Sequence, residues 1–485
     1  MGRRMADAQA AAGTGEGSSV VFTGGTLLVG GSAGSSLRRA GVVWDDRAGK
    51  QRAPAYLFGE IAARADAAGE RLTGDLRELW PPAPRSWDRL ALRSYQEAAL
   101  SAWMVAGRRG ILALPTGAGK TRVALAAILA CGVPAVVLCP TRALMGAWAS
   151  QLGATLGERI GIVGDGERTI ERVTVMTFES AYRRLDGVGD RFGLLVVDEV
   201  HHFASGARAE ALEACAAPAR LGLSATAPPA GTEGALRLAE LVGPVVTEIK
   251  VAELAGTHLA ELSIVQLPVE LAADERERYE RLVAPFASLR RLFFRQHRGA
   301  GYEEMVRVVG STAEGRAALR DHAAAVQVAC FPRAKQALVS TLLARHRADR
   351  TIVFTARVED AYRVSERDLV PVITGEVGAQ ERDRILAKFR DGRVRAIASA
   401  RVLNEGIDVP DARIAIVVSG SLGAREHVQR IGRVLRPAPG KRALVYELVT
   451  RGTLDERLAR SRSLDARPSP LERAGDDGGA DVAAV

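Results

Sequence analysis

One stretch of the chain decides its fold: Leu114-Pro115-Thr116-Gly117-Ala118-Gly119-Lys120-Thr121. An apolar run precedes it at 110–113 and an apolar helical pattern follows at 122–130, so the sequence predicts a strand, a glycine-rich loop and a helix. Glycines in the loop let backbone N–H groups close around phosphate oxygens, and the helix N-terminus adds partial positive charge. The stretch therefore predicts a nucleotide-binding loop, with an ordinary glycine-rich turn as the alternative.

Each residue type in the loop suits a nucleotide. Lys120 can reach the β- and γ-phosphates, and the Thr121 hydroxyl can ligate Mg²⁺. Leu114 departs from the general pattern, which has glycine at this position, and helicase-type loops often relax it. We assign nucleotide binding to Pro115, Thr116, Gly117, Ala118, Gly119, Lys120 and Thr121.

Composition limits the class of protein. A chain of 485 residues is long enough for about three domains. No run of about 18 apolar residues occurs, so we expect no membrane span. The net charge of +9 favours a polyanionic partner without establishing one. The four cysteines have no C-x-x-C spacing, which indicates free thiols and a cytoplasmic location.

The order of patterns along the chain predicts an α/β fold with two parallel-sheet domains in tandem. Apolar strands alternate with helical patterns over 88–250 and again from 351 onward, whereas the part between them is helical and charged. We divide the chain into a disordered tail (1–19), a small α+β domain (20–85), a first α/β domain (86–250), a linker with a helical insert (251–335), a second α/β domain (336–462) and a disordered tail (463–485).

Two acids follow the apolar run Leu194–Val197. Ligands bind at the carboxyl ends of strands in such sheets, so Asp198 is suited to the Mg²⁺ side and Glu199 to orienting or deprotonating the attacking water. A surface acid pair is the alternative. Adjacent histidines rarely ligate one ion, so we interpret His201 as coupling the nucleotide site to other strands.

A basic helical pattern lies at 429–436. Arg433 and Arg436 are spaced i, i+3 and share a helix face, where two guanidinium groups could stabilise a developing phosphate charge as arginine fingers. A solvated basic helix face is the alternative.

Taken in order, these motifs resemble those of superfamily-two helicases, and within them the XPB/Rad25-like, archaeal-type DNA-repair helicases. The Asp198-Glu199-Val200-His201 form of the acidic motif is the one that XPB proteins favour. The matching stretches are 92–96, 114–121, 139–142, 176–180, 198–201, 224–226, 352–355, 403–410 and 429–436.

The resemblance implies roles for further residues and for both α/β domains. These would be RecA-like domains that together bind ATP and Mg²⁺, preceded by a damage-recognition-like domain at 20–85. Arg93, Gln96, Asp408 and Gln429 would bind the nucleotide; Thr141, Arg142 and Thr177 would face the DNA backbone; and Ser224 and Thr226, with His201, would couple hydrolysis to domain movement.

The insert is placed like the family's thumb. Arginines alternate with apolar residues at 289–298, and Arg290, Arg291 and Arg295 could track DNA phosphates. The other interpretation is an amphipathic helix whose Leu292, Phe293 and Phe294 lie in a core; both can hold together.

The resemblance implies an ATP-dependent DNA helicase or translocase with 3′-5′ polarity, acting in DNA repair at single-stranded/duplex junctions, as a monomer and beside a nuclease of the Bax family. One departure bears on unwinding: the Arg-Glu-Asp tripeptide usual in XPB proteins does not follow Thr226, where Ala227-Pro228-Pro229 stands. Two alternatives stay open, a duplex translocase that does not separate strands and an ATP-binding scaffold that recruits a nuclease.

Overall fold

The computed structural model describes residues 18–35, 41–83, 90–254, 261–400, 412–419 and 442–462. The chain divides into two units, of which the first takes in residues up to Leu114 and then Gly119–Ile249, and the second takes in Pro115–Ala118 and residues from Lys250 onward. In the described ranges, no helix is both long and apolar enough to cross a membrane.

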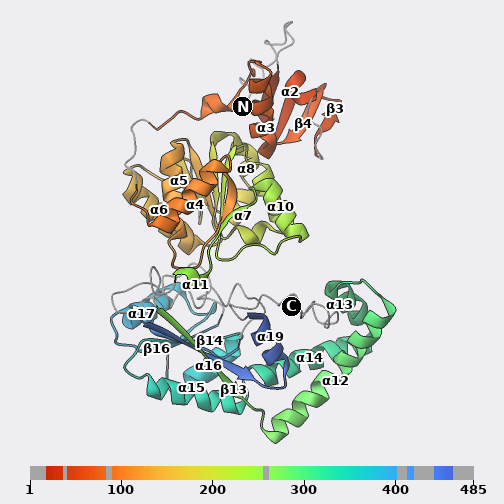
Figure 1. The fold of residues 1–485 in the computed structure, drawn as a ribbon, viewed down its shortest axis with the longest axis vertical. Coiled ribbons are helices and arrows are strands. Elements are labelled where there is room, and N and C mark those ends of the chain that lie inside the picture. The colour runs from red at the N-terminus through yellow and green to blue at the C-terminus, as the bar shows by residue number, and fades with distance from the viewer. Residues whose placement is uncertain are drawn as a thin grey trace. The chain divides into compact units, whose positions relative to one another are not determined.

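The first unit begins with a small antiparallel sheet, drawn in red in Figure 1. Its strand order is β1-β2-β4-β3, from β1 (Ser19–Thr23), β2 (Thr26–Gly30), β3 (Val43–Asp45) and β4 (Lys50–Pro54). The buried strand residues Val20, Leu27, Val29 and Ala53 pack in one core with the apolar side of α3 (Phe58–Ala67). The described residues 18–35 and 41–83 therefore fold as the α+β arrangement that the sequence predicts.

A mostly parallel sheet follows, with the strand order β12-β5-β11-β10-β6-β9-β7-β8. The strands are β5 (Arg109–Ala113), β6 (Ala135–Cys139), β7 (Gly161–Gly164), β8 (Glu167–Thr169), β9 (Val173–Thr177), β10 (Leu194–Val197), β11 (Ala219–Ser224) and β12 (Val245–Glu248). The principal helices are α4 (Ser94–Val105), α5 (Lys120–Cys131), α6 (Arg142–Leu156), α7 (Phe178–Tyr182), α8 (Leu185–Val188), α9 (Glu210–Glu213) and α10 (Glu233–Leu241).

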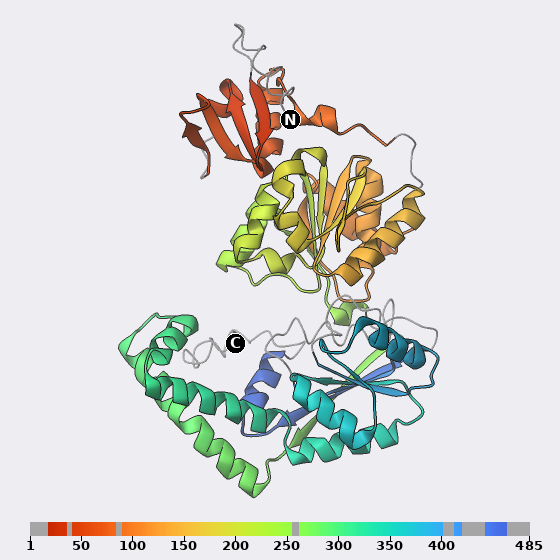
Figure 2. The ribbon, with the colours of Figure 1, turned by 180° about the vertical axis from the view of Figure 1, so that it is seen from behind.

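Helices cover both sides of this sheet, the orange ones on one side and the yellow-green ones on the other in Figures 1 and 2. Every residue of β6, β10 and β11 is buried, as expected for strands of a parallel sheet with two covered faces. The same burial explains why the apolar runs along these strands lack alternation.

The small N-terminal sheet domain shares a hydrophobic core with the first parallel-sheet domain. Phe58 packs edge-on against Trp80, with 5.4 Å between the ring centroids, and the Trp80 indole donates to the carbonyl of Asp190 at 2.8 Å. A Cβ atom added to Gly59 would lie 2.9 Å from Pro218, so only glycine permits this close approach. The two parts of the first unit are thus tightly packed.

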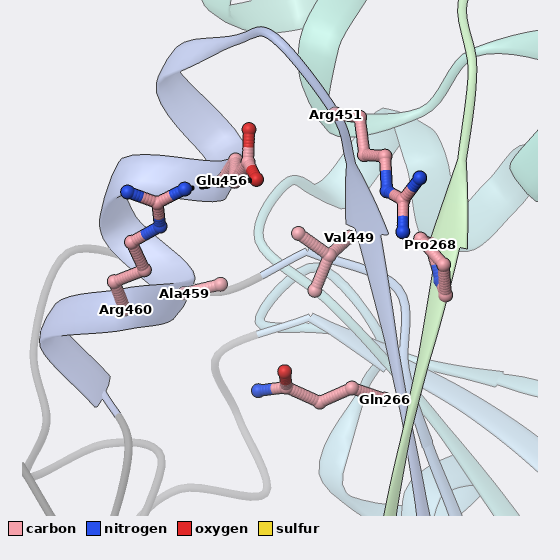
Figure 3. A pocket seen from close by; sticks show the side chains of 7 residues that line it. All are labelled: Gln266, Pro268, Val449, Arg451, Glu456, Ala459 and Arg460. Carbon is pink, nitrogen blue, oxygen red and sulfur yellow. Dashed lines mark hydrogen bonds and ion pairs between the residues drawn. The ribbon is translucent and has the colours of Figure 1, made fainter.

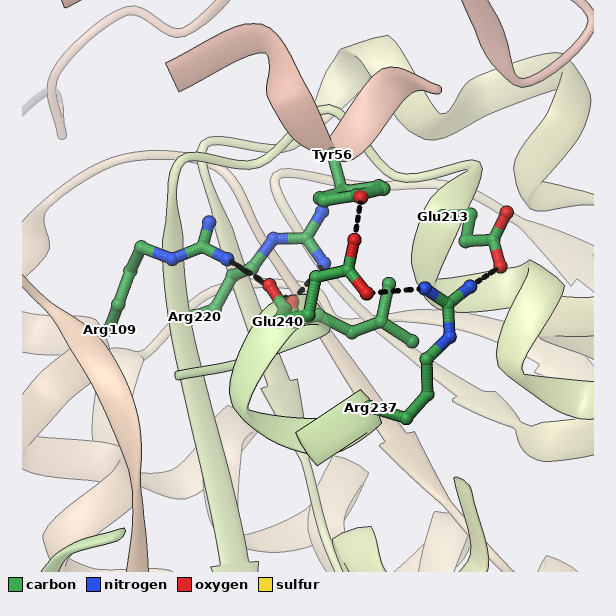
Figure 4. Close-up of polar contacts among 7 residues, drawn as sticks. Tyr56, Arg109, Glu213, Arg220, Arg237 and Glu240 are labelled. Atoms are coloured by element: carbon green, nitrogen blue, oxygen red, sulfur yellow. Dashed lines mark hydrogen bonds and ion pairs between the residues drawn. The ribbon is translucent and has the colours of Figure 1, made fainter. Parts of the chain in front are cut away.

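A polar network crosses the same boundary (Figure 4). The fully buried guanidinium of Arg220 donates to four backbone carbonyls, and the Tyr56 ring centroid lies 5.9 Å from its Cζ. The Tyr56 hydroxyl donates to Glu240, which Arg237 also contacts. Burial lowers the pKa of Arg220 to about 9. Carbonyl oxygens and an aromatic face therefore solvate this cation in place of water.

The second unit contains a parallel sheet with the strand order β13-β18-β17-β14-β16-β15. The strands are β13 (Glu261–Val269), β14 (Thr351–Thr355), β15 (Val372–Ile373), β16 (Ala396–Ala400), β17 (Ile414–Val417) and β18 (Arg442–Thr450). The described helices of the second unit outside residues 273–330 are α11 (Val251–Leu254), α15 (Arg333–Arg345), α16 (Val358–Asp368), α17 (Ala379–Arg390) and α19 (Leu454–Arg462).

β13 corrects one expectation from the sequence. We placed 251–335 in a linker and helical insert, yet Glu261–Val269 pairs along its whole length with β18 and belongs to the second sheet. No local pattern near 261–269 indicates this partner, because the paired strand lies about 180 positions away.

A buried ion pair ties together elements of the second sheet domain. The Lys335 ammonium group lies 2.7 Å from Asp455 Oδ2 and also donates to the carbonyl of Val418, and both charged side chains are almost fully buried. Asp455 accepts a further bond from the Thr450 backbone. The pair thereby joins α15, the end of β17 and α19.

The insert consists of α12 (Ala273–Gln296), α13 (Tyr302–Gly310) and α14 (Ala313–Cys330). Figure 2 shows α12 and α14 side by side and α13 at the end remote from the sheet. The insert has hydrophobic clusters of its own, one of which is built on Phe286, Phe293 and Met305. It is therefore a helical subdomain, as the sequence predicts.

A polar cavity of about 560 Å³ lies between α19 and the edge of the second sheet (Figure 3). Arg460 is paired with Glu456 there, at 3.2 Å. None of the described residues that we predict for ATP or DNA binding lines this cavity. The lining residues are Gln266, Pro268, Val449, Arg451, Glu456, Ala459 and Arg460.

Candidate nucleotide and nucleic-acid site

The predicted phosphate loop joins β5 to α5, as expected. Gly117 and Gly119 have φ angles of 87° and 78°, in the left-handed region that favours glycine, and Gly119 is the N-cap of α5. The Ala118 amide donates to the Pro115 carbonyl at 3.1 Å, which closes the turn. Backbone N–H groups and a helix N-terminus thus meet at the end of a buried strand, in the arrangement that binds phosphate.

Leu114 explains the departure from the general loop pattern. Its side chain is fully buried, and its amide donates to the carbonyl of Ser224 at 3.0 Å. The Leu114 carbonyl in turn accepts a bond from the Lys120 ammonium group at 3.1 Å. The first position of the loop therefore extends β5 into the core.

Gln96 lies beside the loop. It is buried, and its Oε1 accepts a bond from the Arg93 amide at 3.0 Å, at the start of α4. A Cβ atom added to Gly119 would lie 2.5 Å from Gln96 Nε2. The Gln96 side chain therefore lies against the glycine-rich turn, although Gln96 precedes Gly119 by 23 positions in the chain. Arg93 contacts Gln96 through its backbone amide.

Asp198 follows the buried strand β10 and is itself 7% exposed. Its Oδ2 accepts a bond from the indole N–H of Trp148 at 3.0 Å, and its Oδ1 accepts one from the Glu199 amide at 3.0 Å. Cys139 lies nearby, and burial, followed by the charge of Asp198, raises the pKa of its thiol well above the ordinary value. The thiol therefore stays neutral at neutral pH.

Glu199 occupies an unusual backbone conformation, with φ at 48° and ψ at 51°. Left-handed geometry costs a non-glycine residue of order 1 kcal/mol and often marks functional positions. Its carboxylate lies 3.5 Å from His201 Nδ1, and the His201 ring stacks on His202 with 4.3 Å between centroids. His202 in turn lies 5.8 Å from Phe178, so ring contacts connect the acidic motif with the start of α7.

The strand order puts the predicted ATP and coupling residues at one edge of the first sheet. β11 lies between β5 and β10, and Ser224 is paired in register with Ala113. Ser224 is buried, and its hydroxyl accepts a bond from the Thr226 amide at 3.4 Å. Lys120 follows β5, Ser224 ends β11 and Asp198 follows β10, and these three strands are adjacent in the sheet. Because the carboxyl ends of parallel strands lie on the same side of a sheet, the three residues are on that side together.

The residues predicted to face DNA begin two helices at the same edge. Thr141 caps α6 by accepting from the Leu144 amide, and Thr177 caps α7 by accepting from the Ser180 amide, each at 3.2 Å. β6 and β9 are neighbours, with Cys139 opposite Thr177. Arg142, at the start of α6, is exposed and forms an ion pair with Asp165.

The arginine-rich stretch of the insert forms an amphipathic helix, but Leu292 lies outside the core that the sequence predicts for it. Phe293 is 4% exposed and lies in the core of the insert, whereas Leu292 is 43% exposed. Arg291 and Arg295 are exposed and Arg290 is half-buried. Phe293 thus packs in the core of the insert, while Arg291 and Arg295 face outward.

Four predicted nucleotide residues, Asp408, Gln429, Arg433 and Arg436, lie outside the residues that the structure describes. Their roles stay predictions from the sequence.

The described residues fit ATP and Mg²⁺. Thr116 Oγ1, in the loop, is buried and has no hydrogen-bond partner among the described residues, which is the kind of atom a bound ligand would satisfy. A hydroxyl at Thr121 and a carboxylate at Asp198 are oxygen ligands of the kind that Mg²⁺ prefers.

Sequence patterns missed two side chains that shape this unit. Trp148 and Arg220 look like an ordinary helix residue and an ordinary strand residue, yet the first contacts Asp198 and the second is the buried cation beneath Tyr56. The sequence signal for Arg220 is a charged residue directly before the apolar run 221–223.

Three family models match the chain in succession. Residues 20–73 match the Xeroderma pigmentosum group B helicase damage recognition domain, 89–229 match the type III restriction enzyme res subunit, and 334–438 match the helicase conserved C-terminal domain.

Two similar proteins are named as XPB proteins, in agreement with the match at residues 20–73. The chain is 39% identical over 385 residues to DNA 3′-5′ translocase XPB2 of Sulfurisphaera tokodaii, covering 79% of this chain and 86% of that protein. It is 30% identical over 387 residues to DNA 3′-5′ helicase XPB of Mycobacterium tuberculosis, covering 76% of this chain and 63% of that protein. With two RecA-like domains, a small N-terminal sheet domain and these relatives, the chain belongs to the XPB family of DNA helicases and translocases.

Proposed function

We propose that this protein is an ATP-dependent DNA translocase or helicase of 3′-5′ polarity that acts in DNA repair. The observation that carries the proposal is the meeting of Lys120, Ser224 and Asp198 at the carboxyl ends of three adjacent strands. The relatives named as 3′-5′ helicases and translocases support its polarity and its substrate.

The chain's own groups supply the chemistry of hydrolysis. Bound Mg²⁺ would neutralise phosphate charge, with Thr121 and Asp198 as its protein ligands. Lys120 would leave the Leu114 carbonyl for the β- and γ-phosphates, and Glu199 would orient and deprotonate the attacking water. Arg433 and Arg436 would stabilise the charge that develops on the transferred phosphoryl group.

DNA contact is proposed at the start of α6 and on the outer side of the insert. The helix N-terminus at Thr141 and the exposed Arg142 offer N–H donors and positive charge to a phosphate. Arg291 and Arg295 offer a second basic surface. Both sets are suited to backbone contact, which binds DNA without reading its sequence.

The test is a Lys120→Ala variant compared with Lys388→Ala, an exposed lysine on α17 outside every motif. We expect DNA-stimulated phosphate release to fall to background in the first variant and to stay unchanged in the second, with DNA binding kept in both. Normal turnover in Lys120→Ala would refute the proposal.

A duplex translocase that does not separate strands is the second candidate. Residues 227–229 after Thr226 are Ala-Pro-Pro, where XPB proteins usually have the Arg-Glu-Asp tripeptide used in unwinding. Displacement of a triplex-forming strand without displacement of a duplex strand would favour this candidate; displacement of both would favour the helicase.

The third candidate, an ATP-binding scaffold for a nuclease, predicts phosphate release near background even with DNA present. A nuclease partner, single-stranded/duplex junctions as the preferred DNA, a monomeric state and a cytoplasmic location are hypotheses that rest on the family resemblance and, for the last, on the free cysteines.

A further inference from the structure

Trp148 makes a contact that the proposed reaction does not yet use. Its indole Nε1 donates to Asp198 Oδ2 at 3.0 Å, and the side chain is 2% exposed. The other Asp198 oxygen accepts from the Glu199 amide, and the Asp198 amide donates to the Leu138 carbonyl. Each oxygen of the Asp198 carboxylate therefore accepts a hydrogen bond, one from Trp148 on α6 and one from the backbone of Glu199.

We propose that Trp148 is a positioning residue that fixes the Asp198 carboxylate for binding Mg²⁺. The inference deepens the proposed function and rests on it. A carboxylate rotates freely about its Cβ–Cγ bond unless its oxygens are bonded, and a donor to one oxygen sets which lone pairs face the phosphate loop. Partners of this kind, which bond a metal ligand from behind, typically change metal affinity 10–100-fold when removed.

Packing alone does not require tryptophan at this position. The buried side of α6 consists of Met145, Trp148, Leu152 and Leu156, spaced as on one helix face. Leucine or phenylalanine would continue this apolar stripe, but neither has an N–H group. The carboxylate is itself almost buried, so a charge-assisted bond there is strong and costly to lose.

Trp103 provides a matched control in the same unit. It is fully buried on α4, and its indole N–H donates at 2.9 Å to the backbone carbonyl of Arg220. Arg220 pairs with Arg109 at the amino end of the sheet, whereas Asp198 follows the carboxyl end of β10. A Trp→Phe change at either position removes one buried indole bond, but only Trp148 touches the Asp198 carboxylate.

The experiment compares Trp148→Phe and Trp103→Phe with the unchanged full-length protein. Mn²⁺ binding is measured by electron paramagnetic resonance with a non-hydrolysable ATP analogue, and DNA-stimulated ATPase is titrated with Mg²⁺. For Trp148→Phe we expect the metal dissociation constant and the half-maximal Mg²⁺ concentration to rise about tenfold, with metal-free nucleotide binding unchanged. Trp103→Phe should match the unchanged protein in all three measurements.

Equal metal affinity in Trp148→Phe and the unchanged protein would overturn the inference, and so would an equal loss in Trp103→Phe. Failure of the proposed function would give a different result, because the unchanged protein would then show no DNA-stimulated hydrolysis. If Trp148→Phe does not fold, 3-benzothienylalanine at position 148 keeps the ring shape and lacks the N–H donor. The same tenfold weakening of metal binding is expected for it, and normal metal binding would overturn the inference.

Discussion

At the scale of the residue, Leu114 has a structural role in the phosphate loop, and the residues that we predict to contact phosphate follow it. A position that is glycine in the general phosphate loop is here a fully buried leucine whose amide bonds to Ser224. The loop is thus anchored to β11 by its first residue, and the glycines needed for phosphate come later, at 117 and 119.

We expect Leu114→Ala to lower the free energy of unfolding of the first unit by about 2–5 kcal/mol, because it leaves a cavity in a packed core. Urea denaturation measures the loss. Leu236→Ala, at a leucine that is 66% exposed, is the control and should change stability little. Similar stabilities of the two variants would contradict the anchoring role.

At the scale of the element, the helices of the insert divide their residues between packing and surface. Phe293 lies in the insert's core, whereas Arg291 and Arg295 on the same helix α12 are exposed. A basic helix can therefore be stable without DNA, since its apolar side is already covered by α13 and α14.

The double variant Arg291→Ala/Arg295→Ala should weaken DNA binding and reduce the slope of log affinity against log salt by about 2, if each arginine neutralises one phosphate. Fluorescence anisotropy over a salt series measures this. Arg345→Ala/Arg347→Ala, which removes two exposed arginines outside the insert, should leave the slope unchanged. An unaltered slope in the first variant would remove the insert from the DNA-binding surface.

The Lys335–Asp455 pair belongs to the same scale, because it joins α15 to α19. We expect Lys335→Met to lower the free energy of unfolding by about 3–5 kcal/mol, since it leaves a buried carboxylate without its cation. Lys335→Met/Asp455→Leu should recover most of the loss, which chemical denaturation of the second unit measures. A double variant as unstable as the single one would show that the charge is not the cause.

At the scale of the molecule, the N-terminal sheet domain and the first parallel-sheet domain form one packed unit. Apolar residues of both parts share a core, and the Tyr56–Glu240 bond and the Arg220 cage lie at their boundary (Figure 4). Movement between these two parts would break this core, so they are expected to move together.

Tyr56→Ala should loosen this boundary by about 3–5 kcal/mol, because it removes a buried ring, whereas Tyr56→Phe should cost only about 1 kcal/mol for the hydrogen bond to Glu240. Hydrogen exchange at residues 19–67 reports the loosening. Unchanged protection of these amides in Tyr56→Ala would mean that the boundary does not depend on this side chain.

Sequence patterns predicted much of this molecule because the patterns are local. Buried parallel strands are short apolar runs, so β10 has the bounds of the apolar run Leu194–Val197. The phosphate loop needs glycines at set positions between a strand and a helix, and the acids follow their strand directly. Local patterns could not show β3, β4, β7, β8 or β12, which are short or partly exposed and, for β12, irregularly paired.

The sequence by itself therefore determined the class of the protein, the phosphate loop and the two acids, because each depends on residues adjacent in the chain. Only the tertiary structure decided that β13 joins the second sheet, that Tyr56 covers Arg220 and that Trp148 bonds Asp198. Those contacts join residues from about 50 to 180 positions apart. Their energy comes from burying partners together, which no local pattern of residues records.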